Sequence, residues 1–465
     1  MDRGSNIDKH KTTVHCPEHV RKKRKEEKMK KQYIRRLLPI LMSGMMLATA
    51  GCGQAAVPAA ESQSPQSQTT ESTGGSSQSA AQQDASAEAA ASAENGQEAT
   101  YLGVEKYGAE ETNKDHKADF RYRFQIGTDE VVLSVDNGTK DENGEYDYPI
   151  QNLLKENYTY RITTEGDRVV SVEEAEQKAP DFTPVVAGTP GEKTLENFLK
   201  TAMMPVGNTL YIYGGGWDWQ DVGSAIQTRT LGVSPDWVRF FNEQNENYTY
   251  KSKDGDEANM DPAHSYYPYG GYNEYYYAGL DCSGYLGWVL YNTFETRSGE
   301  DGYVGGSTGF AKKLADYGWG TWTQKISVPD GTEQNVMKPG DIMSINGHVW
   351  ISLGTCSDKS VVIAHCTPSA SRTGQPGGGV QIGAIGADET CEAYRLAEKY
   401  MSTYYPEWYK RYEVSLKDPQ AYFKFEGEKA GRFTWDVSGQ GEGLTDPAGV
   451  QNMQPEDVLK QIFGE

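Results

Sequence analysis

The chain has 465 residues, with 66 Asp plus Glu against 45 Lys plus Arg, a net charge of −21 and six cysteines. This length leaves room for more than one domain, because single domains usually hold about 100–200 residues. The strong negative charge argues against a protein that binds nucleic acid through its phosphates, since that binding needs clustered cations facing the ligand.

Residues 1–51 have the pattern of a secretion signal. Basic residues precede the apolar run Leu37–Ala50, whose 14 residues fall short of the ~20 that a membrane-spanning helix needs. The run ends in Thr49-Ala50-Gly51-Cys52, which resembles the lipobox of bacterial lipoproteins. The resemblance implies export and an extracytoplasmic protein anchored to the membrane surface through lipid on Cys52, and two or three acyl chains would hold it stably. Translation from Met29 is an alternative start.

Residues 52–99 follow as a segment of low complexity. From residue 53 onward they contain no Lys, no Arg and no aromatic side chain, so they cannot bury enough apolar surface to offset chain entropy. We expect a disordered, lipid-anchored tether, with an average span of about 38 Å as a flexible coil, and ordered sequence from about Tyr101.

Residues 100–180 alternate apolar and polar side chains with a period of two. Phe120, Tyr122, Phe124 and Ile126 alternate with polar residues, and Gly-containing turns separate the runs. This pattern predicts half-buried strands and a small antiparallel β module, either a barrel or a sandwich. The module lacks catalytic residues, so we expect a spacer or ligand-presenting domain, with cell-wall binding as the alternative.

Cys282 opens an apolar segment with the spacing of a core-facing helix. Its apolar residues at 286, 289, 290 and 294 follow the 3.6-residue period. A thiol at a helix N-terminus faces unpaired backbone N–H groups, which favour the thiolate and can donate to an oxyanion. We therefore predict a nucleophile with a lowered pKa, the cysteine that alkylates fastest near neutral pH, with Asp281 and Ser283 beside it in a substrate-binding or oxyanion role.

Two histidines supply a base and a residue to orient it. His348 follows a Pro-Gly-Asp turn and begins one predicted strand, and His365 ends the next strand, Val361–His365, after the loop Gly354–Ser360. A hairpin closed about that loop makes the two imidazoles cross-strand neighbours to within one residue. That geometry suits a relay in which His348 takes the thiol proton and His365 fixes the imidazole.

These motifs resemble those of the NlpC-type papain-like cysteine peptidases of bacterial cell walls. The resemblance covers roughly residues 190–386 and rests on four segments in the family's order, which are Leu210-Tyr-Ile-Tyr-Gly-Gly215, Asp281-Cys-Ser-Gly284, Lys338-Pro-Gly-Asp341 with Gly347-His-Val349, and His365. It implies that Cys282 is the nucleophile, His348 the base and His365 the orienting residue, while Tyr211 lines the cleft. It also implies an α+β fold with a Cys-bearing helix on an antiparallel sheet, hydrolysis of peptidoglycan stem-peptide amides, and no cofactor.

The chain departs from that family between Tyr211 and Cys282, which lie 71 positions apart, far more than the family usually has. Residues 217–278 therefore form an insertion within a peptidase domain of residues 190–420. It is rich in aromatic residues, including Trp217, Trp219, Trp237, Phe240, Phe241 and a Tyr-rich run over 266–277. It would be either a self-packed loop or a wall that shapes the substrate cleft.

The C-terminal part contributes helices and three further cysteines. We expect a helix over 388–412, a terminal helix over 455–463, and an extension of residues 421–465 that packs on the core. Cys356, Cys366 and Cys391 lack the C-x-x-C spacing of a zinc site, so no metal is expected. They are either all reduced or, if one disulfide forms, joined as Cys366 to Cys391.

Three functions remain open on the sequence. The first is a peptidoglycan stem-peptide endopeptidase that works through a Cys–His–His relay and an acyl-enzyme. The second is a catalytically silent lipoprotein of the cell surface that binds wall or another ligand. The third is a thiol amidase or acyltransferase with a different substrate. Nucleic acid is not an expected partner of any of them.

Overall fold

The computed structural model describes residues 96–104, 120–142, 144, 146–177, 179–217, 223–243, 275–324, 326–332, 335–375, 377–424 and 428–465. The signal segment, Cys52 and all but the end of the tether lie outside these residues, as do Trp219 and residues 244–274 of the insertion. Within the described part of the chain, no helix combines the length and apolar character needed to cross a bilayer.

The first folded part is a closed five-stranded barrel of order β1-β2-β3-β5-β4. Its strands are β1 (Gln97–Val104), β2 (Tyr122–Ile126), β3 (Asp129–Val135), β4 (Thr159–Glu165) and β5 (Arg168–Glu174). The alternating side chains predicted from sequence do fill its core, and β3 and β5 pair in parallel rather than antiparallel. β1 begins at Gln97, so ordered structure starts before the expected boundary at Tyr101.

The second part is a mixed α/β domain built on a seven-stranded sheet of order β13-β12-β11-β10-β9-β14-β8. The strands of this sheet are β8 (Gly320–Thr323), β9 (Ile342–Ile345), β10 (His348–Thr355), β11 (Val361–Pro368), β12 (Gly378–Ile385), β13 (Leu416–Lys417) and β14 (Gly431–Trp435). A separate two-stranded pair joins β6 (Leu210–Tyr211) to β7 (Gly279–Leu280).

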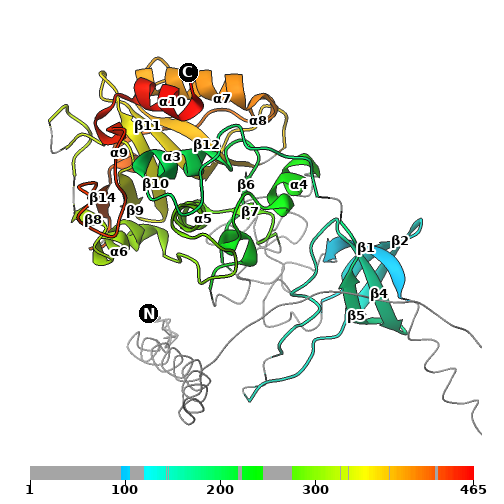
Figure 1. Cartoon of the computed structure of the whole chain (residues 1–465). Coiled ribbons are helices and arrows are strands. Elements are labelled where there is room, and N and C mark those ends of the chain that lie inside the picture. The colour runs from blue at the N-terminus through cyan, green and yellow to red at the C-terminus, as the bar shows by residue number, and fades with distance from the viewer. Residues whose placement is uncertain are drawn as a thin grey trace, which may run out of the picture. The chain divides into compact units, whose positions relative to one another are not determined.

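The helices of this domain pack chiefly on one face of the sheet. They are α3 (Leu195–Met203), η3 (Ile226–Arg229), α4 (Pro235–Glu243), α5 (Cys282–Phe294), η5 (Ser307–Gly309), α6 (Phe310–Asp316), α7 (Glu392–Tyr404), α8 (Pro406–Arg411), α9 (Pro419–Tyr422), η7 (Val450–Asn452) and α10 (Pro455–Phe463). Figure 1 shows α7, α8 and α10 gathered beside the strands of the sheet. Pro406 separates α7 from α8, because its ring cannot continue a helix, so the single helix expected over 388–412 is two.

Alternation along the central strands sorts their side chains onto the two faces of the sheet. Val349, Ile351 and Leu353 of β10 face the large core that contains α3, α5 and α7. Trp350 of the same strand belongs to a smaller cluster on the opposite face, which Phe423 helps to cover. This alternation follows from the two-residue period of a strand.

Residues 421–465 do more than pack against the core. β14 pairs with both β9 and β8, so it is an internal strand of the sheet. The boundary expected at residue 420 is therefore wrong, because the sheet is completed only by residues near the C-terminus. The predicted terminal helix is present as α10, with Val458, Leu459 and Ile462 buried.

The hairpin of β10 and β11 has a slightly different register from the one expected. Ile351 pairs with Ala364, and the register shifts between Ser352 and Gly354 at a β-bulge. Extended along the strands, this pairing puts Trp350 opposite His365 and leaves His348 one diagonal step away on the same face. The two histidines are therefore diagonal rather than direct cross-strand neighbours, because this register places position 348 opposite position 367, two residues beyond His365.

The insertion packs most of its described aromatic residues into the protein interior. Trp237, Phe240 and Phe241 on α4 are buried, and the ring of Trp237 meets that of Trp288 on α5 edge-on, with centroids 5.7 Å apart. For these residues the structure matches a self-packed element rather than an exposed wall that stacks against substrate.

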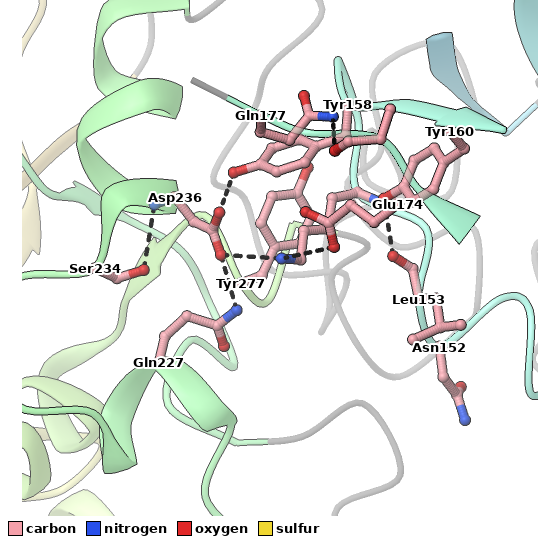
Figure 2. Close-up of polar contacts among 12 residues, drawn as sticks. Asn152, Leu153, Tyr158, Tyr160, Glu174, Gln177, Gln227, Ser234, Asp236 and Tyr277 are labelled. Carbon is pink, nitrogen blue, oxygen red and sulfur yellow. Dashed lines mark hydrogen bonds and ion pairs between the residues drawn. The ribbon is translucent and has the colours of Figure 1, made fainter. Parts of the chain in front are cut away.

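The barrel contacts the insertion through a polar cluster on α4 (Figure 2). The Asp236 carboxylate accepts hydrogen bonds from the Tyr158 hydroxyl and from Gln227 Nε2, the latter at 3.1 Å, and lies 3.3 Å from Lys155 Nζ. The Tyr277 hydroxyl donates to the Glu156 carbonyl at 3.2 Å. Tyr277 lies just before β7, so a barrel loop packs against the strand that leads to Cys282.

Replacement of Asp236 by alanine is expected to destabilise the protein. The Asp236 and Lys155 side chains are only 14% and 22% exposed, and removal of the carboxylate would leave the ammonium and the Tyr158 hydroxyl without this shared partner. We expect unfolding to become easier by about 1–3 kcal/mol, measured by urea denaturation. The matched variant Tyr158→Phe removes the hydroxyl that donates to Asp236 and accepts from Arg239 Nε, but it keeps the Lys155–Asp236 ion pair and should cost less. No change in Asp236→Ala would contradict the importance of this contact.

Candidate active site

Cys282 is the first residue of α5, and Asp281 is its N-cap. Asp281 Oδ1 accepts hydrogen bonds from Gly284 N at 2.7 Å and from Ser283 Oγ at 2.9 Å. These bonds satisfy a free donor of the first helical turn. The Asp-Cys-Ser-Gly motif is thus a capping arrangement that fixes Cys282 at the helix start, and Asp281 and Ser283 hydrogen-bond each other.

Glycines bring a second chain segment against this helix start. A Cβ on Gly284 would lie 2.2 Å from Gly215 O, and one on Gly216 would lie 2.4 Å from Gly284 Cα. Only residues without a side chain allow such an approach. Tyr211 pairs with Leu280 in the parallel β6–β7 ladder, so the fold brings Tyr211 close to Cys282 across the long insertion.

The thiol of Cys282 faces the turn that precedes His348. Its Sγ lies 3.9 Å from Gly347 O, to which it donates, and the residue is 5% exposed. Gly347 has a φ of +77°, a conformation that favours glycine. The turn between β9 and β10 thereby sets the carbonyl of Gly347, the residue directly before His348, beside the sulfur.

Burial raises the pKa of the Cys282 thiol to about 12, and the Asp281 carboxylate adds to the effect. Backbone N–H groups of Val349, Ser283 and Cys282 lower the pKa but do not offset burial. The prediction of a depressed pKa is therefore wrong for the resting site. The helix N-terminus acts as expected, but removal of the sulfur from water outweighs it.

The two histidines form a relay that ends on a serine. His348 Nε2 lies 3.4 Å from His365 Nδ1, and His365 Nε2 lies 2.8 Å from Ser415 Oγ. Ser415 N in turn donates to Gln381 Oε1 at 3.0 Å. The structure thus brings His348 and His365 together as predicted and leaves Nδ1 of His348 outside the relay.

Both imidazoles are held neutral. Burial, followed by the charge of Lys417, lowers the pKa of His348 to about 3. Burial, His348 and Lys417 lower the pKa of the fully buried His365 well below its ordinary value. A neutral imidazole has the lone pair that a general base needs, but these low pKa values oppose a resting thiolate–imidazolium pair.

Tyr422 on α9 completes the site, and no local motif marks this residue in the sequence. Its ring centroid lies 5.5 Å from that of His348 and 6.3 Å from that of His365. Burial and the nearby Cys282 raise the pKa of its hydroxyl. Ser415 and Lys417 likewise lie outside the recognised motifs. All three residues are C-terminal to those motifs and reach the site only because β13 and α9 pack there.

The described cysteines outside the site match the first of the two expected alternatives, in which all are reduced, and not the Cys366–Cys391 bridge. Among the described residues, Cys282, Cys356, Cys366 and Cys391 are all free thiols. Cys366 Sγ donates to Leu280 O at 3.0 Å, whereas Cys391 lies beside Gly386, past the other end of β11. That end is about 16 Å from Cys366 at ~3.3 Å per residue, which exceeds the ~7 Å Cα separation of a disulfide.

Cys356, Asp358 and Glu392 bring three potential metal-ligand atoms within 4.8 Å of one another. Their carboxylates already have structural partners. Asp358 Oδ2 accepts from Glu392 N at 2.7 Å, and Glu392 Oε2 accepts from Ser357 N and Oγ. These hydrogen bonds fasten the start of α7 to the β10–β11 loop, and they account for the cluster.

The buried Asp281 carboxylate should make the stability of the folded state depend on pH. Burial raises its pKa to about 6 from the ordinary 3.8, so the ionised carboxylate destabilises the folded state above that pH, and the penalty disappears as pH falls through the interval. We expect wild type to gain stability relative to Asp281→Asn between pH 7.5 and pH 4, measured by urea unfolding. Asp281→Ala should lose about 1 kcal/mol of cap energy relative to Asp281→Asn; a pH-independent difference between wild type and Asp281→Asn would contradict this.

Comparisons with protein-family models, with curated proteins and with solved structures give no match to this chain.

Proposed function

We propose that the chain is a cysteine endopeptidase that hydrolyses amide bonds in peptidoglycan stem peptides. The observation that supports this most directly is the relay of His348, His365 and Ser415, with contacts of 3.4 and 2.8 Å. His348, the first residue of the relay, directly follows Gly347, whose carbonyl faces the thiol of Cys282 at the start of α5. The substrate class comes from the resemblance of the four motifs to cell-wall peptidases.

The proposed reaction uses the thiol twice. Cys282 Sγ attacks the amide carbonyl carbon while its proton passes to His348, and the oxyanion accepts hydrogen bonds from N–H groups at the start of α5. The C–N bond then breaks, and the leaving amine takes the proton from His348. Water next attacks the thioester as His348 accepts its proton. The C–S bond then breaks, and His348 returns this proton to the sulfur, which releases the carboxylic acid and regenerates the thiol.

The expected site of action is the outer surface of a membrane, through lipid on Cys52. This part of the proposal rests on the lipobox-like segment alone. Expression of the chain and of Cys52→Ser in a bacterium that processes lipoproteins would test it. Wild type should fractionate with membranes and Cys52→Ser should not; equal membrane association of both would contradict an anchor at Cys52.

Incubation of the purified protein with digested peptidoglycan, followed by mass analysis, tests the enzymatic proposal. Wild type should produce new peptide fragments with added water, and Cys282→Ala should produce none. Fragments from both proteins would rule out Cys282 as the nucleophile. Products that carry a transferred acyl group instead of water would point to an acyltransferase.

A surface protein that binds wall peptides without cleaving them is the second candidate. It is favoured by the resting thiol, which donates to Gly347 O and whose pKa burial raises to about 12. In that case, wild type and Cys282→Ala would bind the same muropeptides equally well, and neither would yield products over long incubation.

A further inference from the structure

A groove of about 720 Å³ lies beside the catalytic turn and is lined by lysines. Its walls are the Gly-rich loop 305–309, α6 and Lys429, and the lysines are Lys312, Lys313 and Lys429. Among the described lining residues, Asp316 is the single acid. This local excess of positive charge stands out on a chain whose net charge is −21.

The three lysines differ in how far their charges are neutralised. Lys312 Nζ lies 2.8 Å from Asp316 Oδ1, so that charge is balanced within the groove. Lys313 Nζ donates to the Val304 carbonyl, a neutral partner that leaves the charge intact. The exposed Lys429 lies beside Gly309: a Cβ added to Gly309 would be 3.4 Å from Lys429 Cδ. The groove therefore has a net charge of about +2, which attracts anions.

Hydrogen bonds connect this groove to the nucleophile. Thr308, in its wall, accepts a hydrogen bond from Gly347 N at 3.0 Å, and Gly347 O lies 3.9 Å from Cys282 Sγ. Ala311 N donates to Ser344 Oγ of β9 at 2.9 Å, which fastens α6 to the sheet. These bonds fasten loop 305–309 and the start of α6, which form the groove wall, to the turn that faces the sulfur of Cys282.

We propose that the lysine groove is a substrate subsite that binds a carboxylate of the peptide next to the bond to be cleaved. This inference rests on the proposed peptidase function and names what selects its substrate. Stem peptides carry free carboxylates. A lysine ammonium in a partly desolvated groove would bind a peptide carboxylate more tightly than the corresponding neutral carboxamide. The same charge would also attract phosphodiesters of anionic wall polymers, so the test must separate the two sources.

The test compares Lys429→Gln with wild type on two substrates. One is a muropeptide with free carboxylates, and the other is the same peptide with its carboxylates converted to carboxamides. Wild type should prefer the free carboxylate by about tenfold in kcat/KM, the size of one charge-assisted contact. Lys429→Gln should lose most of that preference and change little towards the carboxamide. Lys410→Gln, which makes the same charge change on α8 outside the groove, should keep the preference.

Binding to Cys282→Ala separates failure of this subsite from failure of the proposed enzyme. Fluorescence anisotropy with both labelled peptides should show a carboxylate preference that Lys429→Gln removes, even if no peptide is hydrolysed. Hydrolysis or binding without any carboxylate preference would overturn the subsite and leave the peptidase proposal intact. If poly(glycerol phosphate) binds in a Lys429-dependent way and the free-carboxylate peptide does not, the peptide proposal is overturned in favour of a polymer site.

Discussion

His348→Asn is expected to abolish nearly all hydrolysis, whereas His365→Asn is expected to retain a measurable rate. An asparagine at 348 has no basic nitrogen to take the thiol proton, and the loss of a general base typically costs 10²–10⁴-fold. An asparagine at 365 can still accept a hydrogen bond from His348 Nε2, which lies 3.4 Å from the native partner atom. Its loss should be smaller, roughly tenfold to a hundredfold, because it orients the base without accepting the thiol proton.

The measurement is kcat/KM on a purified muropeptide, with thermal unfolding of each variant as the check that the fold survives. Ser415→Ala removes the other partner of His365, 2.8 Å from its Nε2, and should resemble His365→Asn. In the double variant Ser415→Ala/His365→Asn, the loss of Ser415 should add little to the loss of His365. The reason is that Ser415 acts through the imidazole of His365, which is already absent. Equal losses in His348→Asn and His365→Asn would show that the two histidines do not have separate roles.

The second large effect concerns the reactivity of the free thiol. Because burial raises the pKa of Cys282 to about 12, we expect slow alkylation by iodoacetamide at pH 7 and a rate that rises steadily to pH 10. Of the four cysteines that the structure describes, the half-buried Cys391 should be labelled first on accessibility alone. Peptide mapping after short pulses of reagent at each pH measures both rates.

A plateau in the Cys282 rate near neutral pH would contradict this expectation and restore the preformed thiolate that the sequence suggested. A steady rise instead has a consequence for catalysis. Proton transfer from the thiol to His348, whose pKa burial and Lys417 lower to about 3, would then have to accompany attack on the substrate. Lys417→Met should in that case raise the pKa of His348, because a cation near the imidazole has been removed. The low-pH limb of the kcat/KM profile should then move to higher pH.

The local pattern of apolar residues was sufficient to predict the helices and strands that depend on neighbours in sequence. The period of the apolar residues after Cys282 predicted α5, and the alternation before and after the Gly-containing turns predicted strands of the barrel and of the hairpin. The proximity of His348 and His365 could also be predicted, since a hairpin brings its two strands together through a short loop, although the exact register could not. Each of these predictions rests on a spacing of a few residues.

Only the tertiary structure could decide the features that join distant segments. β14 enters the sheet between β9 and β8, and Ser415, Lys417 and Tyr422 reach the histidines through β13 and α9. Burial of the thiol is likewise a property of the whole packed domain, and it reverses the pKa shift that the helix start alone would give. The sequence by itself determined which side chains carry the proposed chemistry, while long-range packing determined their solvation and their partners, because neither depends on a spacing that one segment can encode.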